Sequence, residues 1–187
     1  MSERGVFAWF VLGARLLWYL LDERGRRETT VALLHRELTA LKSAGGAGGR
    51  EVFLGSLVAQ AYAATGDVTA ALGVLGESLI LAEARIEPYY EAELHRLLGE
   101  LRFDNGASPA EAEGCFRRAV EVARRQGARS MELRAATSLA RLLASEGGRD
   151  EARQVLGDIY GAFTEGFDTA DLREAQRLLH GSSTADI

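Results

Sequence analysis

Residues 89–127 read YYEAELHRLLGELRFDNGASPAEAEGCFRRAVEVARRQG. Apolar residues recur in this stretch every three or four positions, which predicts two amphipathic helices over 89–105 and 109–126. The start of the second helix is well specified: Ser108 is its N-cap, Pro109 its first helical residue, and Glu111 completes a capping box. Gly127 is typical of a helix C-terminus. The stretch therefore predicts a helical hairpin with defined ends.

The same hairpin recurs along the whole chain. Its central turn is marked by glycines at spacings of 40 or 41 residues: Gly25, Gly66, Gly106 and Gly147. Apolar positions of the second helix keep the same spacing: Leu34, Leu75, Phe116 and Leu156. Each helix pair buries its apolar stripe by stacking on the next pair, so such pairs form arrays. We therefore expect an all-α fold, a right-handed α-solenoid of four helical hairpins with a C-terminal capping helix.

The predicted boundaries follow from this period. One repeat domain is expected over residues 1–180, with hairpins at 5–44, 50–86, 88–127 and 129–165, a cap at 168–180 and a polar tail at 181–187. The other helices are expected at 6–23, 28–43, 51–65, 67–85, 129–146, 149–164 and 169–180. Asp67 and Asp168 are the expected N-caps of two of them.

Composition limits the function classes. The chain has 187 residues, of which 47% are hydrophobic, and only two prolines, so long helices can run uninterrupted. A net charge of −5 argues against nucleic-acid binding, which normally needs a basic excess. Cys115 is the only cysteine and cannot form an internal disulfide, which fits a reducing cytoplasm. We interpret it as a small core residue.

Residues 6–21, VFAWFVLGARLLWYLL, are strongly apolar. They are shorter than the roughly 20 residues that span a bilayer, and Arg15 in their middle would be costly in lipid, so no membrane span is expected. The helix they predict is apolar on all sides, which indicates burial all round. A missing upstream repeat, a homodimer contact or a membrane surface would each cover its outer face. We favour the first two, and assign self-association to Phe7, Trp9, Phe10, Trp18 and Tyr19.

The repeats resemble the tetratricopeptide repeat (TPR), whose first helix carries a large residue and Leu-Gly and whose second carries Ala, a large apolar residue and Ala. The third hairpin matches with Leu98-Gly99, Ala112, Phe116 and Ala119. The second matches with Val58-Ala59, Tyr62, Ala71 and Leu75, and the fourth with Leu139-Ala140, Ala152 and Leu156. The first hairpin matches least well. The period exceeds the usual value of about 34 residues, so longer helices are expected.

A second resemblance covers residues 89–179. Their sequence is similar to the C-terminal helical repeats of bacterial signalling proteins that join a class III adenylate/guanylate cyclase or a DNA-binding domain to an AAA-type ATPase. This resemblance implies a regulatory, scaffolding tail. No GxxxxGK[ST] phosphate-binding motif occurs, and the glycine-rich loop 45–49 lacks the Lys and Ser/Thr that would make one. No catalytic residue follows from the resemblance.

The remaining polar groups give no sign of chemistry. His35, His95 and His180 lie in different repeats, and none has a second ligand at i+3 or i+4, so no metal site, cofactor or enzyme activity is expected. The carboxylates Glu91, Glu93 and Glu100 are interpreted as a solvated face with helical ion-pair partners. The arginines of a basic cluster alternate with glutamates and are interpreted as a salt-bridged face: Arg117, Arg118, Arg124, Arg125 and Arg129.

The resemblance to TPR arrays implies that the first helix of each pair lines a concave groove where partners bind. The register assigns eight groove-facing residues: Ser56, Gln60, Glu93, Arg96, Glu100, Arg134, Thr137 and Arg141. Their mixed charge suits a polar peptide or a partner domain. We hypothesise a non-catalytic, cytoplasmic interaction module of bacterial signal transduction. The alternative is a sensing module that binds a small effector inside the superhelix.

Overall fold

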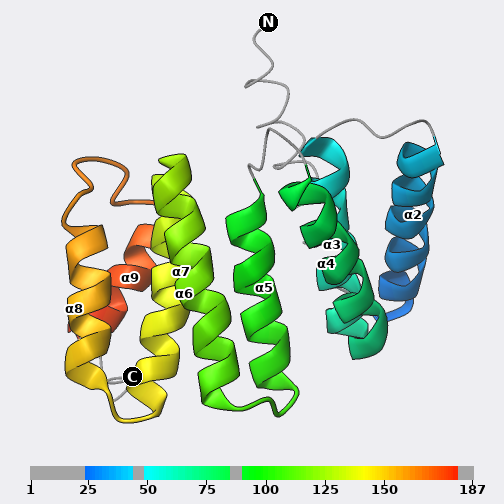
Figure 1. The fold of residues 1–187 in the computed structure, drawn as a ribbon. Coiled ribbons are helices and arrows are strands. Elements are labelled where there is room, and N and C mark those ends of the chain that lie inside the picture. Colours follow the sequence, from blue (N-terminus) through cyan, green and yellow to red (C-terminus); the bar gives the residue numbers. More distant parts are fainter. Residues whose placement is uncertain (1–23, 44–48, 85–89, 181–187) are drawn as a thin grey trace, which may run out of the picture. The chain divides into compact units, whose positions relative to one another are not determined.

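The computed structural model describes residues 24–43, 49–84 and 90–180 of the chain. Over these residues the backbone forms eight α-helices and no strand. They are α2 (Arg24–Ser43), α3 (Gly49–Thr65), α4 (Val68–Glu83), α5 (Glu91–Asp104), α6 (Pro109–Gln126), α7 (Arg129–Ser145), α8 (Arg149–Tyr160) and α9 (Ala170–His180). Figure 1 shows α5 with α6, and α7 with α8, as antiparallel pairs.

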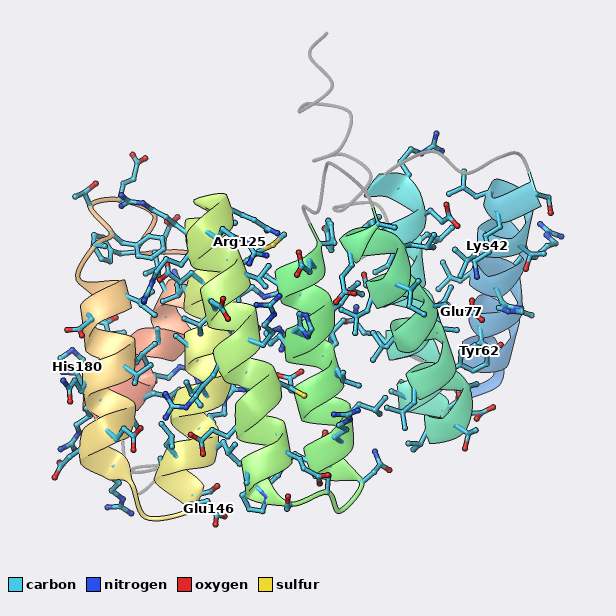
Figure 2. The ribbon with its side chains drawn as sticks, in the orientation of Figure 1. Lys42, Tyr62, Glu77, Arg125, Glu146 and His180 are labelled. Atoms are coloured by element: carbon cyan, nitrogen blue, oxygen red, sulfur yellow. The ribbon has the colours of Figure 1, made fainter. Side chains whose placement is uncertain are left out.

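The chain divides into two compact units after Ser78, within α4. In the first unit, α2 packs against α3. An ion pair of 2.5 Å between Lys42 Nζ and Glu77 Oε2 joins α2 to α4, and Figure 2 shows both residues. The ring of His35 meets that of Tyr62 edge-on at a centroid distance of 6.0 Å. Buried residues of α3, Val58 and Ala61 among them, form the core of this unit.

The second unit contains α5 to α9. Helix α7 lies at its centre and packs against α5, α6, α8 and α9. The main apolar cluster takes residues from α6, α7, α8 and α9: Phe116, Leu133, Leu139, Leu156 and Leu172 are among its members. The odd-numbered helices α5, α7 and α9 thus form one layer, and α6 and α8 pack against it.

Close packing between these layers depends on small residues. An ideal Cβ on Gly99 of α5 would lie 2.7 Å from Cε1 of Phe116, so α5 approaches α6 too closely for any side chain there. Phe116 is 3% exposed. The glycine of the Leu-Gly motif is therefore required at position 99, because α6 packs the ring of Phe116 against the backbone of α5.

Most helix ends agree with the sequence prediction. Helix α6 has the predicted bounds, Ser108 and Glu111 form the predicted capping box, and Gly127 is the left-handed C-cap, with φ of 64°. Asp67 Oδ1 accepts a hydrogen bond from the Ala70 amide at 3.0 Å, which confirms its capping role. Three of the four predicted turn glycines have positive φ: Gly66, Gly106 and Gly147.

Three predictions of local structure are wrong. Gly25 is not in a turn, since α2 already begins at Arg24. A glycine within a helix costs roughly 1 kcal/mol relative to alanine, but α2 also contains arginines and leucines, which favour the helix. Helix α8 ends at Tyr160 instead of residue 164, because the amides of Ala162 and Phe163 bond to carbonyls three residues back and tighten the backbone. Helix α9 begins at Ala170, so Thr169 and not Asp168 precedes it.

Several expectations lie outside the described residues. These are the first predicted helix with its self-association residues Phe7, Trp9, Phe10, Trp18 and Tyr19, the loop 45–48, and the tail 181–187. Within the part of the chain that the structure describes, none of the helices combines the length and the apolar character needed to cross a bilayer.

Candidate interaction face

The layer formed by α5, α7 and α9 carries most of the residues that the sequence register assigned to a partner site. We call this side of the second unit the α5–α7–α9 face. From α5 it takes Glu93, Arg96 and Glu100, and from α7 it takes Arg134, Ser138 and Arg141. Helix α9 adds Glu174 and Arg177, which the sequence analysis did not single out.

Arg96 is the centre of the polar contacts on α5. Its Nε and Nη2 atoms donate to the two carboxylate oxygens of Glu93 at 2.9 and 2.8 Å, a bidentate ion pair between residues one helical turn apart. Its Nη1 atom also forms an ion pair with Glu100. Arg96 and Glu93 are 8% and 4% exposed, so this pair is desolvated. One guanidinium therefore serves two carboxylates.

Helix α7 completes this group of charges. Arg134 Nη2 lies 2.8 Å from Glu93 Oε1, and Ser138 Oγ donates to Glu100 Oε1 at 2.8 Å. With two arginines and two glutamates the group is electrically neutral, which is what a buried site requires. We call it the charged junction: Glu93, Arg96, Glu100, Arg134 and Ser138.

The electrostatics of Arg96 follow from this geometry. Burial opposes its charged form, but the hydrogen bonds and charges of Glu93 and Glu100 outweigh burial and raise the pKa of Arg96 above its ordinary value. The guanidinium is therefore held charged. An arginine so held is a fixed link between α5 and α7, and it is poorly placed to meet a ligand from solvent.

Exposure separates this fixed interior from an accessible rim. The Arg134 side chain is 29% exposed although its partner Glu93 is 4% exposed. Further along, Arg141 of α7 lies 3.2 Å from Glu174 of α9, and the two side chains are 49% and 26% exposed. Arg177 pairs with the same Glu174. In these three pairs the arginine side chain is more exposed than that of its glutamate partner. The Glu100 side chain on the same face is 33% exposed.

The structure therefore divides the eight predicted groove residues. Four of the predicted groove-facing residues are buried and not accessible on the surface of this chain: Ser56, Glu93, Arg96 and Thr137. Ser56 and Thr137 turn their hydroxyls to backbone carbonyls of their own helices, those of Phe53 and Leu133. Gln60 and Arg141 are exposed, and Glu100 and Arg134 are partly exposed. Ser56 and Gln60 belong to the first unit.

Other charged residues of α5 and α6 also include both buried and exposed members. Glu91, predicted to be solvated, is 4% exposed and lies 3.5 Å from Arg125 and 3.8 Å from Arg118. The predicted salt-bridged arginine cluster is confirmed for its four members on α6, whereas Arg129 is the first residue of α7 and donates to the Ala162 carbonyl. Arg117 pairs with Glu113 and Glu151 at 2.6 Å each, and Arg124 pairs with Glu132 at 2.9 Å.

No group of three potential metal ligands gathers in the described ranges. Cys115 is buried in α6, as predicted for a core residue. His95 is half-buried on α5, and its Nε2 atom has no hydrogen-bond partner among the described residues. Burial first, and then the charge of Arg118, lower the pKa of His95 from its ordinary value of 6.5; Glu83 and Glu121 oppose this shift.

Comparison with known proteins identifies the architecture. No family model matches the chain, and no curated protein matches it. Solved structures do. One is a variant of the nearly identical TPR-like repeats of a Podosopora anserina protein assigned as a kinesin light chain; it has 20% sequence identity and a TM-score of 0.66, and the match covers 90% of this chain and 82% of that one. A second structure of these repeats has 20% identity and a TM-score of 0.65, with coverage of 90% and 83%.

This likeness spans nearly the whole chain and shows the fold. The chain is an all-α solenoid of TPR-like helical hairpins. The predicted fold class is thereby confirmed. The sequence held no signal that separates the buried from the accessible groove residues. Glu93 and Arg96 are three residues apart, a spacing that permits an ion pair, but Arg118 and Glu121 have the same spacing and are 40% and 64% exposed.

Proposed function

We propose that the chain is a non-catalytic protein-interaction scaffold, and that the α5–α7–α9 face of its second unit binds an acidic segment of a partner protein. One observation carries the proposal: in the ion pairs of Arg134, Arg141 and Arg177 the arginine side chain is more exposed than its glutamate partner, whereas Arg96 is less exposed than Glu100. An acidic segment could therefore reach these three arginines while their partners Glu93 and Glu174 are less accessible. The fold supports the proposal because stacked helical repeats create extended binding surfaces.

The charged junction gives this surface a rigid base. Binding needs no new order at Arg96, because its hydrogen bonds are already made, and a preorganised face loses less entropy on association. The predicted partner residues Arg134, Arg141 and Glu100 remain candidates in this scheme. Ser56, Glu93, Arg96 and Thr137 take a supporting role, and Gln60 remains a candidate on the first unit.

The wider role we propose rests on the sequence resemblance. A cytoplasmic scaffold that forms, or derives from, the tail of a bacterial cyclase–ATPase signalling protein would report partner occupancy through small changes in superhelical pitch. Self-association through Phe7, Trp9, Phe10, Trp18 and Tyr19 stays a separate prediction.

Affinity capture with the full chain tests the proposal. The double variant Arg134→Gln/Arg141→Gln removes accessible charge from the face, and the matched variant Arg117→Gln/Arg124→Gln removes as many arginines from α6. Lysate of the source cells is passed over each immobilised protein, and the bound proteins are quantified by mass spectrometry. We expect a partner with an acidic segment to drop at least tenfold with the first variant only.

Equal capture by all three proteins, with helicity unchanged by circular dichroism, would contradict the acidic-segment proposal. Loss with the α6 variant instead would move the interaction to the other layer. A purified partner then allows a second check, because a charge-dominated interface weakens with salt. An affinity that does not change between low and physiological ionic strength would also contradict it.

A further inference from the structure

A small pocket lies away from the α5–α7–α9 face, where the α6–α7 turn meets the end of α8. Its volume is about 200 Å³, and it is lined by Arg124, Arg129, Glu132, Asp158, Ile159, Ala162 and Phe163. Figure 1 shows the two segments that form it at the same end of the second unit. The pocket is smaller than the roughly 300–1,000 Å³ typical of sites for drug-sized ligands, so we consider a molecule the size of one amino acid.

The charges that line the pocket are not all used within the protein. Arg124 and Glu132 neutralise each other at 2.9 Å. Arg129 gives one hydrogen bond, from Nη1 to the Ala162 carbonyl at 3.0 Å, which leaves the other donors of its guanidinium. Asp158 is exposed and has no hydrogen-bond or ion-pair partner among the described residues. No ion pair within 4.0 Å joins Arg129 to Asp158, although both line the same pocket.

Each of these two charges lies at the end of its helix where the helix dipole disfavours it. Arg129 is the first residue of α7, where the helix dipole favours negative charge, and Asp158 is in the last turn of α8, where it favours positive charge. Residues that break such a local rule are expected where function requires them. Arg129 has one hydrogen bond in return, to the Ala162 carbonyl, and Asp158 has none among the described residues. The apolar part of the lining, which includes buried Ile159 and half-buried Phe163, adds a surface for hydrocarbon.

We infer that this pocket binds a small zwitterion with an apolar side chain, of the class of a free hydrophobic amino acid. The ammonium group of such a ligand pairs with the Asp158 carboxylate, and its carboxylate pairs with the Arg129 guanidinium. Its side chain packs on Ile159 and Phe163. A simple cation would be repelled by Arg129, and a simple anion by Asp158, so the two charges together select a molecule that carries both signs.

Titration of the full, ¹⁵N-labelled chain with L-leucine, followed by amide chemical shifts, tests the inference. We expect saturable shifts at Arg129, Asp158 and Ala162 with a Kd on the order of 1 mM, about 4 kcal/mol, as fits so small a ligand. N-acetyl-L-leucine lacks the ammonium group and L-leucinamide lacks the carboxylate. Each should bind at least tenfold more weakly than L-leucine.

Variants of the protein give the complementary test. Asp158→Asn and Arg129→Gln should each weaken L-leucine binding at least tenfold. The matched variants Asp150→Asn and Arg149→Gln alter the same residue types at the other end of α8 and should leave binding unchanged. Both pocket residues are exposed, so we expect each variant to stay folded. Unchanged amide shifts of residues outside the pocket would verify this.

Three results would overturn the inference: no saturable shift with L-leucine up to about twenty times the expected Kd of 1 mM, equal shifts with the two single-charge analogues, or binding that survives the double variant Arg129→Gln/Asp158→Asn. None of these results bears on the acidic-segment proposal, since the pocket shares no residue with the α5–α7–α9 face.

Discussion

The two sides of the second unit carry similar ion pairs in very different surroundings. On α5, Glu93 and Arg96 pair at 2.8 Å, and their side chains are 4% and 9% exposed. On α6, Glu113 and Arg117 pair at 2.6 Å, and theirs are 34% and 47% exposed. Both pairs join residues one helical turn apart. Water solvates the charges of the exposed pair but not those of the buried pair. Loss of one arginine should therefore lower the free energy of unfolding much more at the buried pair than at the exposed pair.

The largest effect is expected from two variants that each remove one guanidinium, one from α5 and one from α6. Arg96→Met removes the bidentate partner of the buried Glu93, which keeps only Arg134, and removes the ion-pair partner of Glu100. We expect a loss of about 3 kcal/mol in the free energy of unfolding. Arg117→Met should cost less than about 1 kcal/mol, because its carboxylate partners remain hydrated. Urea unfolding followed by circular dichroism measures both variants.

Similar losses for Arg96→Met and Arg117→Met would show that burial does not separate the two pairs. The double variant Arg96→Met/Glu93→Gln sharpens the test. It removes the buried Glu93 charge along with Arg96, and the partner that Arg134 loses matters less because Arg134 is 29% exposed. The double variant should therefore be more stable than Arg96→Met alone. A further loss in the double variant would contradict the explanation by an unpaired buried charge.

Glycines on the same two helices provide the next largest contrast. Gly99→Ala places a Cβ 2.7 Å from the ring of Phe116, and we expect this overpacking to cost about 1–3 kcal/mol. An added Cβ on Gly114 of α6 meets nothing within 4 Å. Gly114→Ala should therefore stabilise the chain by about 0.5–1 kcal/mol through helix propensity. Thermal and urea unfolding of both variants give the comparison; destabilisation by both, or by neither, would show that the α5–α6 contact is looser than the structure indicates.

The smallest expected effect concerns a single imidazole on α5. Burial, followed by the charge of Arg118, lowers the pKa of His95 below 6.5 in the folded chain. The unfolded chain therefore binds a proton at a higher pH than the folded chain does, and acid favours unfolding. We expect the free energy of unfolding to fall as pH drops below about 6.5, until the lowered pKa of folded His95 is passed.

His95→Gln isolates this contribution. The difference in free energy of unfolding between pH 7.5 and pH 5.5 should be smaller in the variant than in the parent chain, since about 6.5 is the ordinary histidine pKa. His180→Gln at the exposed end of α9 serves as the control. An identical pH dependence in the parent and in His95→Gln would show that His95 titrates normally.

The sequence determined the local structure of this protein, because the information for it lies within a few residues. Ser108, Pro109, Glu111 and Gly127 specify the ends of α6 through contacts with backbone groups one turn away. The repeat could also be predicted from the sequence, because apolar and small residues recur every 40 or 41 residues. They recur because each hairpin needs an apolar stripe at the same positions to pack against its neighbour. Fold class and most helix bounds followed from these signals.

Only the tertiary structure decided which polar residues are accessible. Glu93, Arg96 and Arg134 all occupy first helices of their hairpins, and the resemblance to TPR arrays predicted that they face a groove. Two of them are buried because α5 and α7 approach closely enough to share a carboxylate, and the exposure of the third depends on that approach. The pocket beside Asp158 arises in the same way, from segments about thirty residues apart in the sequence. Burial is a property of neighbours, and residues distant in sequence become neighbours only when the helices pack.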